Sequence, residues 1–281
     1  FETLISLNKK FNDFSINANA GSDFFRSINR SNYGETVNGL NVRNLFAISN
    51  SIGQAYIDFT RISEKYRAVF IRGDIGFRDF LFGEFTVRND WFSALPPANN
   101  SILSKSFGGS FVFSDLLKLS WLSFGKLRAS WGEIPTSIGA YVYPGYSYKV
   151  DQYKWNTDFI MTTPDQLVDP HIKGAVKTQK EVGLELRFLN NKAGITSTYW
   201  NGSENEIPYN VTIAGYSGFT SKYMNTGEIT KQGLDFTLNL RPLNRTNLKW
   251  DVNSTLSWLI NNKVIKIAEG VESFVVQSLY N

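Results

Sequence analysis

The feature that most constrains this chain is an alternation of apolar and polar residues, repeated in segments of about ten residues. In residues 248–258 the even positions are mostly apolar, including Trp250 and Trp258, whereas Lys249, Asp251 and the remaining odd positions are polar. About ten residues is the length that a tilted β-strand needs to cross a bilayer, and only alternate residues then face lipid. No segment approaches the roughly 18 consecutive apolar residues of a spanning helix. The sequence therefore excludes a helical membrane protein and favours transmembrane β-strands.

The alternation predicts an all-β fold of about ten strands. One short helical turn is expected at 114–119, where Ser114 precedes a Leu-rich stretch and resembles an N-cap. The predicted strands cover about residues 1–9, 14–20, 66–76, 80–90, 106–113, 121–132, 181–189, 193–201, 228–240 and 248–258.

The predicted connections alternate in length. Those at 10–13, 77–79, 114–120, 190–192 and 242–247 are short, whereas those at 22–65, 91–105, 133–180 and 202–227 are long and rich in Asn, Ser, Gly and Tyr. Outer-membrane barrels have short periplasmic turns and longer extracellular loops. The pattern thus predicts a segment of a transmembrane antiparallel β-barrel with this arrangement of turns and loops.

The spacing of tryptophans supports the same interpretation. Trp250 and Trp258 share one face, eight residues apart, and Trp121 and Trp131 share another, ten residues apart. In tilted strands these spacings correspond to roughly 20 and 25 Å of height, close to the apolar band between the two aromatic girdles of a barrel. We therefore predict that these four residues belong to the membrane girdles. Core aromatics of a soluble β-protein are the alternative explanation.

Four tyrosines, Tyr141, Tyr143, Tyr146 and Tyr148, lie close together in one long predicted loop. Their flat apolar faces could stack on sugar rings or line a peptide groove, so they are the predicted ligand-facing aromatics. Packing within the loop is the alternative.

Motifs for catalysis, cofactors or metals are absent from the sequence. The chain has no Cys, and a single His171 cannot build a His-rich metal site. Glu204 and Glu206 lie in a polar loop, where solvated charge is the default explanation. A net charge of +4, scattered along the chain, does not indicate nucleic acid as a partner. We expect no catalytic residue, no cofactor site, no metal site and no enzymatic activity.

Charged residues on the polar faces of the strands are expected to point into the barrel lumen. A charge that faces lipid at the bilayer centre costs about 2–4 kcal/mol, which forces this assignment. Their predicted role is either a network that braces the wall or a polar path for solutes. These residues are Arg72, Asp74, Arg88, Asp90, Lys126 and Arg128.

Four segments resemble the barrel of the SusC/RagA family of TonB-linked outer-membrane proteins. They are residues 85–91 (FTVRNDW), 122–131 (LSFGKLRASW), 180–191 (KEVGLELRFLNN) and 225–235 (NTGEITKQGLD), in the order that the family shows. The match covers about residues 66–262, and residues 1–65 match only by pattern. The approach to Lys180, residues 169–177, departs from the family's Pro-rich form, which indicates a remodelled external loop.

The resemblance implies a plugged barrel of about 22 strands, of which residues 1–281 form part of the single barrel domain. The plug, the N-terminal region that contacts TonB and the closing C-terminal strands are expected to lie outside this chain, which starts in a strand-like run without a signal peptide. The implied location is the bacterial outer membrane, and the implied partners are a SusD-like surface lipoprotein, TonB, membrane lipid and a glycan or peptide ligand.

The first functional hypothesis is active import of an oligomeric nutrient, with this segment as barrel wall and external loops. The second is a structural or adhesive barrel in a larger envelope complex, without transport. The third is a soluble glycan-binding β-domain, which would fold in water without detergent.

Overall fold

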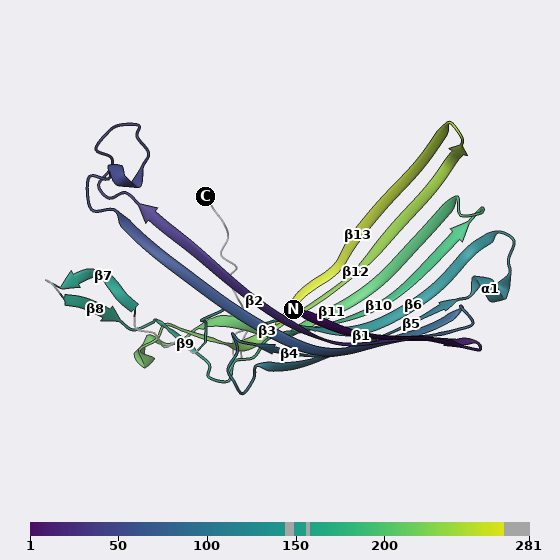
Figure 1. The fold of residues 1–281 in the computed structure, drawn as a ribbon, viewed down its shortest axis with the longest axis horizontal. Helices are drawn as coiled ribbons and strands as arrows, with labels where there is room; N and C mark the ends of the chain where they lie inside the picture. The colour runs from purple at the N-terminus through teal and green to yellow at the C-terminus, as the bar shows by residue number, and fades with distance from the viewer. Residues whose placement is uncertain (144–148, 156–157, 267–281) are drawn as a thin grey trace.

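The computed structural model describes residues 1–143, 149–155 and 158–266. Strands dominate this part of the chain (Figure 1). The strands of the large sheet are β1 (Glu2–Phe11), β2 (Phe14–Glu35), β3 (Tyr56–Phe77), β4 (Leu81–Phe92), β5 (Ser101–Val112), β6 (Leu122–Pro135), β9 (Gln166–Val168), β10 (Val176–Phe188), β11 (Ala193–Thr212), β12 (Ser221–Arg245) and β13 (Leu248–Lys266). A separate hairpin consists of β7 (Lys149–Trp155) and β8 (Asp158–Thr162).

The large sheet is a curved antiparallel meander (Figure 1). Its strand order is β1-β2-β3-β4-β5-β6-β10-β11-β12-β13, so each long strand pairs with the preceding one along the chain. The short strand β9 joins it by parallel pairing with the start of β12. Within the described residues β1 and β13 form the two edges of the sheet. The prediction of about ten antiparallel strands is confirmed.

The cross-strand register sorts the side chains into two continuous faces. On one face Phe85 lies opposite Phe107, and Phe107 lies opposite Trp131. We call this apolar face the lipid face. The other face carries the charged residues, including Glu84 and Arg128, and we call it the lumen face because charge is costly in lipid. The alternation in the sequence, not the average hydropathy, produces these two faces.

Turns lie at one end of the sheet and long loops at the other (Figure 1). The short turns follow β1, β3, β5, β10 and β12. Asn12, Arg78 and Asn190 have positive φ in three of them, as tight hairpin connections require. The turn after β5 contains α1 (Ser114–Leu117), so the predicted helical turn is confirmed. Ser114 is its first helical residue rather than its N-cap, which is Phe113.

Two of the predicted long loops, 22–65 and 202–227, are much shorter than the sequence pattern indicates, because the flanking strands continue beyond the membrane-length segments. The predicted loop 22–65 was wrong for most of its length: β2 runs to Glu35 and β3 starts at Tyr56. Likewise β11 runs to Thr212 and β12 starts at Ser221. In these extensions both faces meet water, so the apolar and polar alternation fades although the backbone pairing continues.

Two parts of the connection between β6 and β10, residues 136–143 and 163–175, pack against the loop end of the sheet around a small hydrophobic cluster. Leu95, Ile138, Val168 and Ile172 form its buried centre, and Ile172 is fully inaccessible to solvent. The cluster holds the connection against the loop after β4. Among the described residues, no helix is long and apolar enough to span a membrane.

Candidate functional site: the lumen wall and the external loops

The four predicted girdle tryptophans lie on the lipid face, in two rows. Trp121 and Trp250 lie near the turn end of the sheet, and Trp131 and Trp258 lie toward the loop end. Trp121 stacks on Phe188 with ring centroids 5.9 Å apart, and Trp131 stacks on Phe107 at the same distance. Trp121, Trp250 and Trp258 are all more than half exposed in this chain. Large exposed aromatic surfaces in two rows fit membrane interfaces.

The four loop tyrosines do not form one described cluster. Tyr141 is exposed, and its hydroxyl accepts a hydrogen bond from the backbone N–H of Ser63 at 3.2 Å. Tyr143 packs against the hydrophobic cluster at the loop end. Tyr146 and Tyr148 lie outside the described residues. Their predicted ligand-facing role stays a prediction.

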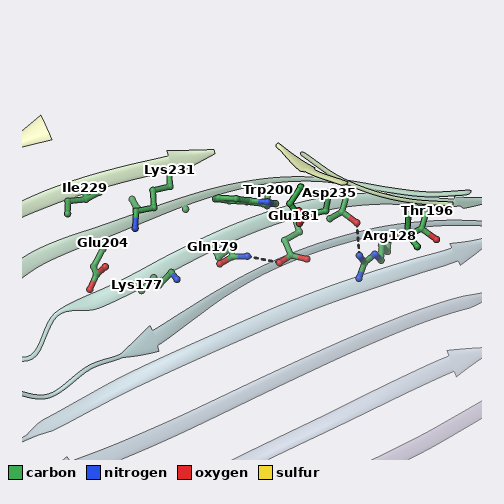
Figure 2. A pocket seen from close by; sticks show the side chains of 15 residues that line it. Arg128, Lys177, Gln179, Glu181, Thr196, Trp200, Glu204, Ile229, Lys231 and Asp235 are labelled. Carbon is green, nitrogen blue, oxygen red and sulfur yellow. Dashed lines mark hydrogen bonds between the residues drawn. The ribbon is translucent and has the colours of Figure 1, made fainter. Parts of the chain in front are cut away.

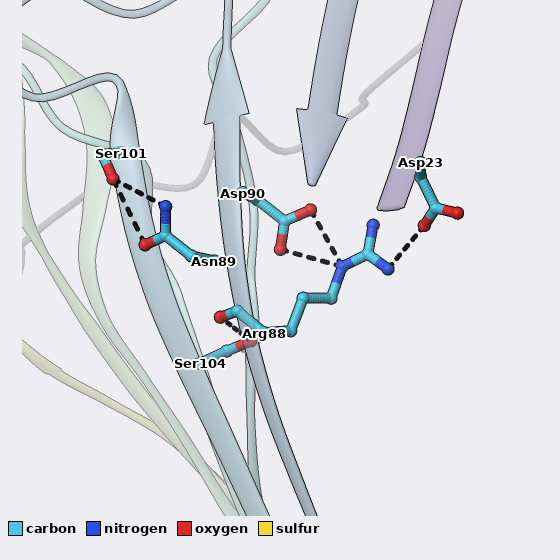
Figure 3. A network of polar contacts seen from close by, with 6 residues as sticks. All are labelled: Asp23, Arg88, Asn89, Asp90, Ser101 and Ser104. Carbon is cyan, nitrogen blue, oxygen red and sulfur yellow. Dashed lines mark hydrogen bonds and ion pairs between the residues drawn. The ribbon is translucent and has the colours of Figure 1, made fainter. Parts of the chain in front are cut away.

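An ion-pair network on the lumen face joins β2 and β4 (Figure 3). The Arg88 guanidinium lies 2.6 Å from an Asp23 carboxylate oxygen and 2.9 Å from one of Asp90. Asp90 is only 4% exposed. The Ser104 hydroxyl donates to the Arg88 carbonyl oxygen across the adjoining pair of strands. A buried carboxylate that keeps such a partner is stable, whereas one that loses it is costly, so this network braces the wall.

A polar hollow lies further along the lumen face, on β6 and β10 to β13 (Figure 2). Its volume is about 650 Å³. Three basic and three acidic side chains line it, so their formal charges cancel: Arg128, Lys177, Lys231, Glu181, Glu204 and Asp235. Within the described residues no ion pair joins these six side chains, although Arg128 donates to Thr198 and Glu181 accepts from Gln179.

The floor of the hollow consists of long side chains that lie across glycines of the neighbouring strand. A Cβ atom on Gly183 would lie 2.4 Å from Arg128 Nε, so the absence of that atom lets the Arg128 side chain lie along the wall. In this position Arg128 Nη2 donates to Thr198 Oγ1 at 2.8 Å. Trp200 lies in the same way across Gly233, where a Cβ atom would be 2.7 Å from the indole Cζ2.

Sequence reasoning missed Trp200 and this hollow. The alternation in the sequence could have placed Trp200. It follows Thr196 and Thr198 at alternate positions, so its side chain belongs to the polar face and not to a girdle. The hollow itself could not be found in this way, because it depends on which residues the register places opposite one another.

A second polar cluster orders the loop between β9 and β10. The Asp169 carboxylate accepts a hydrogen bond from the His171 backbone N–H at 2.9 Å and lies 3.2 Å from Lys222 Nζ. The backbone hydrogen bond and the Lys222 cation hold the pKa of Asp169 below its ordinary value, although partial desolvation opposes them. The Asn225 amide donates to the carbonyl oxygens of Lys173 and Glu206. These contacts fasten the loop to β11 and β12.

The structure does not bring Glu204, Glu206 and His171 together as a catalytic or metal-binding group. Glu204 lines the hollow, whereas Glu206 lies 3.7 Å from Lys173 Nζ in the external region, so the two carboxylates serve different surroundings. His171 is mostly exposed. Across residues 1–143, 149–155 and 158–266, no group of three or more His, Cys, Asp or Glu residues could hold a metal ion.

Comparison with known proteins identifies the family. The sequence model described as "TonB dependent receptor-like, beta-barrel" matches residues 3–273, nearly the whole chain. The chain belongs to the TonB-dependent receptor-like β-barrel family. It is therefore a segment of an outer-membrane β-barrel, and the predicted fold class and location are confirmed. A soluble β-domain, the third hypothesis, is wrong.

Among curated relatives, this TonB-dependent receptor-like barrel segment is 26% identical over 200 residues to the TonB-dependent receptor SusC of Bacteroides thetaiotaomicron. It is 21% identical over 199 residues to the TonB-dependent receptor P3 of Formosa agariphila. These alignments cover 67% and 68% of the chain, but only 20% and 19% of the relatives. The chain thus spans about a fifth of the length of either protein.

Solved structures share the fold. The RagAB peptide importer in its closed-closed state superposes with a TM-score of 0.81 and 19% identity, over 99% of this chain and 31% of that chain. The siderophore receptor PirA from Pseudomonas aeruginosa gives a TM-score of 0.53 and 13% identity, over 92% of this chain and 42% of that chain. The backbone is therefore more similar to RagAB than to this siderophore receptor. The resemblance to SusC/RagA barrels is confirmed.

Proposed function

We propose that the protein containing this segment imports an oligomeric nutrient, a glycan or a peptide, across the outer membrane with energy delivered through TonB. The observation that carries this proposal is the match to the TonB-dependent receptor-like barrel family over residues 3–273, together with a polar hollow on the lumen face. Within this proposal the chain provides barrel wall and external loops, and contributes no catalytic residue.

The remaining barrel strands, the plug and the region that contacts TonB are proposed to lie in other parts of the protein. The two edges of the described sheet, β1 and β13, support this, because unpaired edge groups have no water to bond within lipid. Residues 1–281 are accordingly part of one barrel domain. The proposed girdle residues are Trp121, Trp131, Trp250 and Trp258, which would anchor this domain at the two membrane interfaces.

A SusD-like surface lipoprotein is the proposed partner at the loop end. The name SusC of one relative and the similarity to RagAB support this partner. The loop end offers surface for such a contact, since the Asp169 cluster and the hydrophobic cluster hold residues 163–175 against the sheet.

The test is uptake by the bacterium that encodes the protein. Fluorescently labelled oligosaccharides and peptides would be offered to the wild-type strain, to a strain lacking this gene and to a strain lacking TonB function. We expect uptake of one class by the wild-type strain alone, and a surface lipoprotein among the proteins that co-purify from mild detergent. Equal uptake by all three strains would contradict import and favour the structural or adhesive barrel.

A further inference from the structure

Trp200 presents one flat indole face to the lumen hollow, because the wall covers the other. A Cβ atom on Gly233 would lie 2.7 Å from Cζ2 and 2.9 Å from Cε2 of the indole, so one ring face rests directly on the Gly233 backbone. Trp200 is half-buried and lines the hollow. Figure 2 shows the ring nearly edge-on, lying along the strands beside Glu181 and Asp235. An aromatic ring held in this way is a rigid apolar platform.

Hydrogen-bond donors and acceptors both lie around this platform. The Gln179 amide donates to Glu181 Oε1 at 2.7 Å, which fixes both side chains beside the ring. Lys231 and Asp235, from the next strand, also line the hollow and supply a donor and an acceptor. A ligand here would find an apolar plane with donors and acceptors around its edge.

The charges of the hollow give no net preference for a charged ligand. Its three basic and three acidic side chains cancel formally, so the hollow offers no net attraction to an anion or to a cation. A neutral ligand with many hydroxyl groups, each both donor and acceptor, satisfies such a mixed rim.

A peptide would lack its usual main-chain partners at this position. Trp200 pairs with Glu181 on one side and Gly233 on the other, and Gln179 pairs with Gly132 and Gly202. The backbone groups of the wall are therefore used within the sheet, whereas strand addition of a peptide needs an exposed sheet edge.

We propose that the hollow is a subsite for a neutral glycan, in which the apolar face of a pyranose ring stacks on Trp200 and its hydroxyl groups bond to Gln179, Glu181, Lys231 and Asp235. This inference rests on the proposed import function and chooses glycan over peptide as the cargo class. Gly202 lines the same hollow and leaves space there, since a Cβ atom on it would make only one ordinary contact, 3.5 Å from the Thr178 carbonyl oxygen.

The test uses the full-length protein in lipid nanodiscs, applied to an array of plant, microbial and host glycans. Wild-type protein is expected to bind at least one neutral glycan, whose dissociation constant is then measured by calorimetry. Trp200→Ala should weaken binding at least about tenfold, the change that corresponds to roughly 1.4 kcal/mol. Trp200→Phe, with a smaller ring, should give an intermediate loss.

Two further variants separate stacking from misfolding. Gly202→Leu fills the hollow without touching the support of Trp200 and should abolish binding, while the matched control Trp258→Ala, on the lipid face, should retain wild-type affinity. Heat-modifiable migration in gels confirms that each variant is a folded barrel.

Absence of glycan binding by the wild-type protein, or unchanged affinity in both Trp200→Ala and Gly202→Leu, would overturn the inference. Binding of a peptide digest that depends on Trp200 would also overturn it. If TonB-dependent uptake persists in the Trp200→Ala and Gly202→Leu variants, the subsite is refuted and the import function stands. If uptake persists in the strain lacking the gene and in the strain lacking TonB function, import itself is refuted.

Discussion

Trp200 and Trp258 are neighbours in the wall but lie on its opposite faces. The indole of Trp200 rests on Gly233 and faces the lumen, while Trp258, opposite Leu234, is 64% exposed on the lipid face. The same residue type is thus a platform on one face and a membrane contact on the other. The face is decided by whether the position is odd or even along its strand, so position in the pleat, rather than residue type, sets the role of each tryptophan.

The largest change in the free energy of unfolding is expected when an arginine is placed on each face at a similar depth in the membrane. Leu184→Arg, opposite Leu127 on the lipid face, should lower the free energy of unfolding by about 2–4 kcal/mol, because the charge meets the bilayer interior. Thr255→Arg, on the lumen face of β13 opposite Thr237, should change it by less than about 1 kcal/mol. Denaturant unfolding of the full-length barrel in phospholipid measures both losses, and equal losses would contradict the assignment of faces.

The next test removes the centre of the lumen network. Arg88→Met leaves the buried Asp90 carboxylate and Asp23 without their cation, and should cost about 2–3 kcal/mol. The control is Arg187→Met, which breaks a more exposed pair with Glu185 on the same face and should cost less than about 1 kcal/mol. Unfolding curves that show no difference between these variants would remove the bracing role.

A smaller effect is expected at the glycines under the lumen side chains. Gly183→Ala pushes Arg128 off the wall and breaks its hydrogen bond to the buried Thr198, at a cost of about 1 kcal/mol relative to Gly83→Ala. Gly83 is the control because a Cβ atom there meets nothing within 4 Å. If the two substitutions are equivalent in unfolding experiments, Arg128 does not depend on the missing side chain.

The smallest effect concerns pH at the external loop. The pKa of Asp169 is lowered in the fold, so its stabilising contacts are complete above the ordinary carboxyl pKa of about 4 and are lost as the pH falls through the lower folded value. Amide exchange at His171 and Ile172, corrected for intrinsic rates, should therefore accelerate below about pH 4. Asp169→Asn should exchange faster at neutral pH and lose this acid dependence. An unchanged pH profile in the variant would exclude Asp169 as the titrating group.

The strands of the membrane band were predictable from sequence, whereas their outer extensions were not. In residues 248–258 the alternation reflects two different solvents on the two faces, and β13 contains this whole segment. Above the membrane the solvent is water on both sides. The outer parts of β2 and β3 therefore show no clear alternation, and they were predicted as loop.

By itself the sequence determined the all-β class, the two faces, the order of turns and loops and the placement of four tryptophans on the lipid face, because these depend on residues close together in the chain. Only the tertiary structure decided which side chains meet. Arg88 reaches Asp23, which is 65 residues away, and Trp200 lies on Gly233 because the register places them opposite one another. A periodic pattern specifies the face of each residue, but a register shift by two residues would keep every face and change every neighbour, so the lumen hollow exists only once the strands have paired.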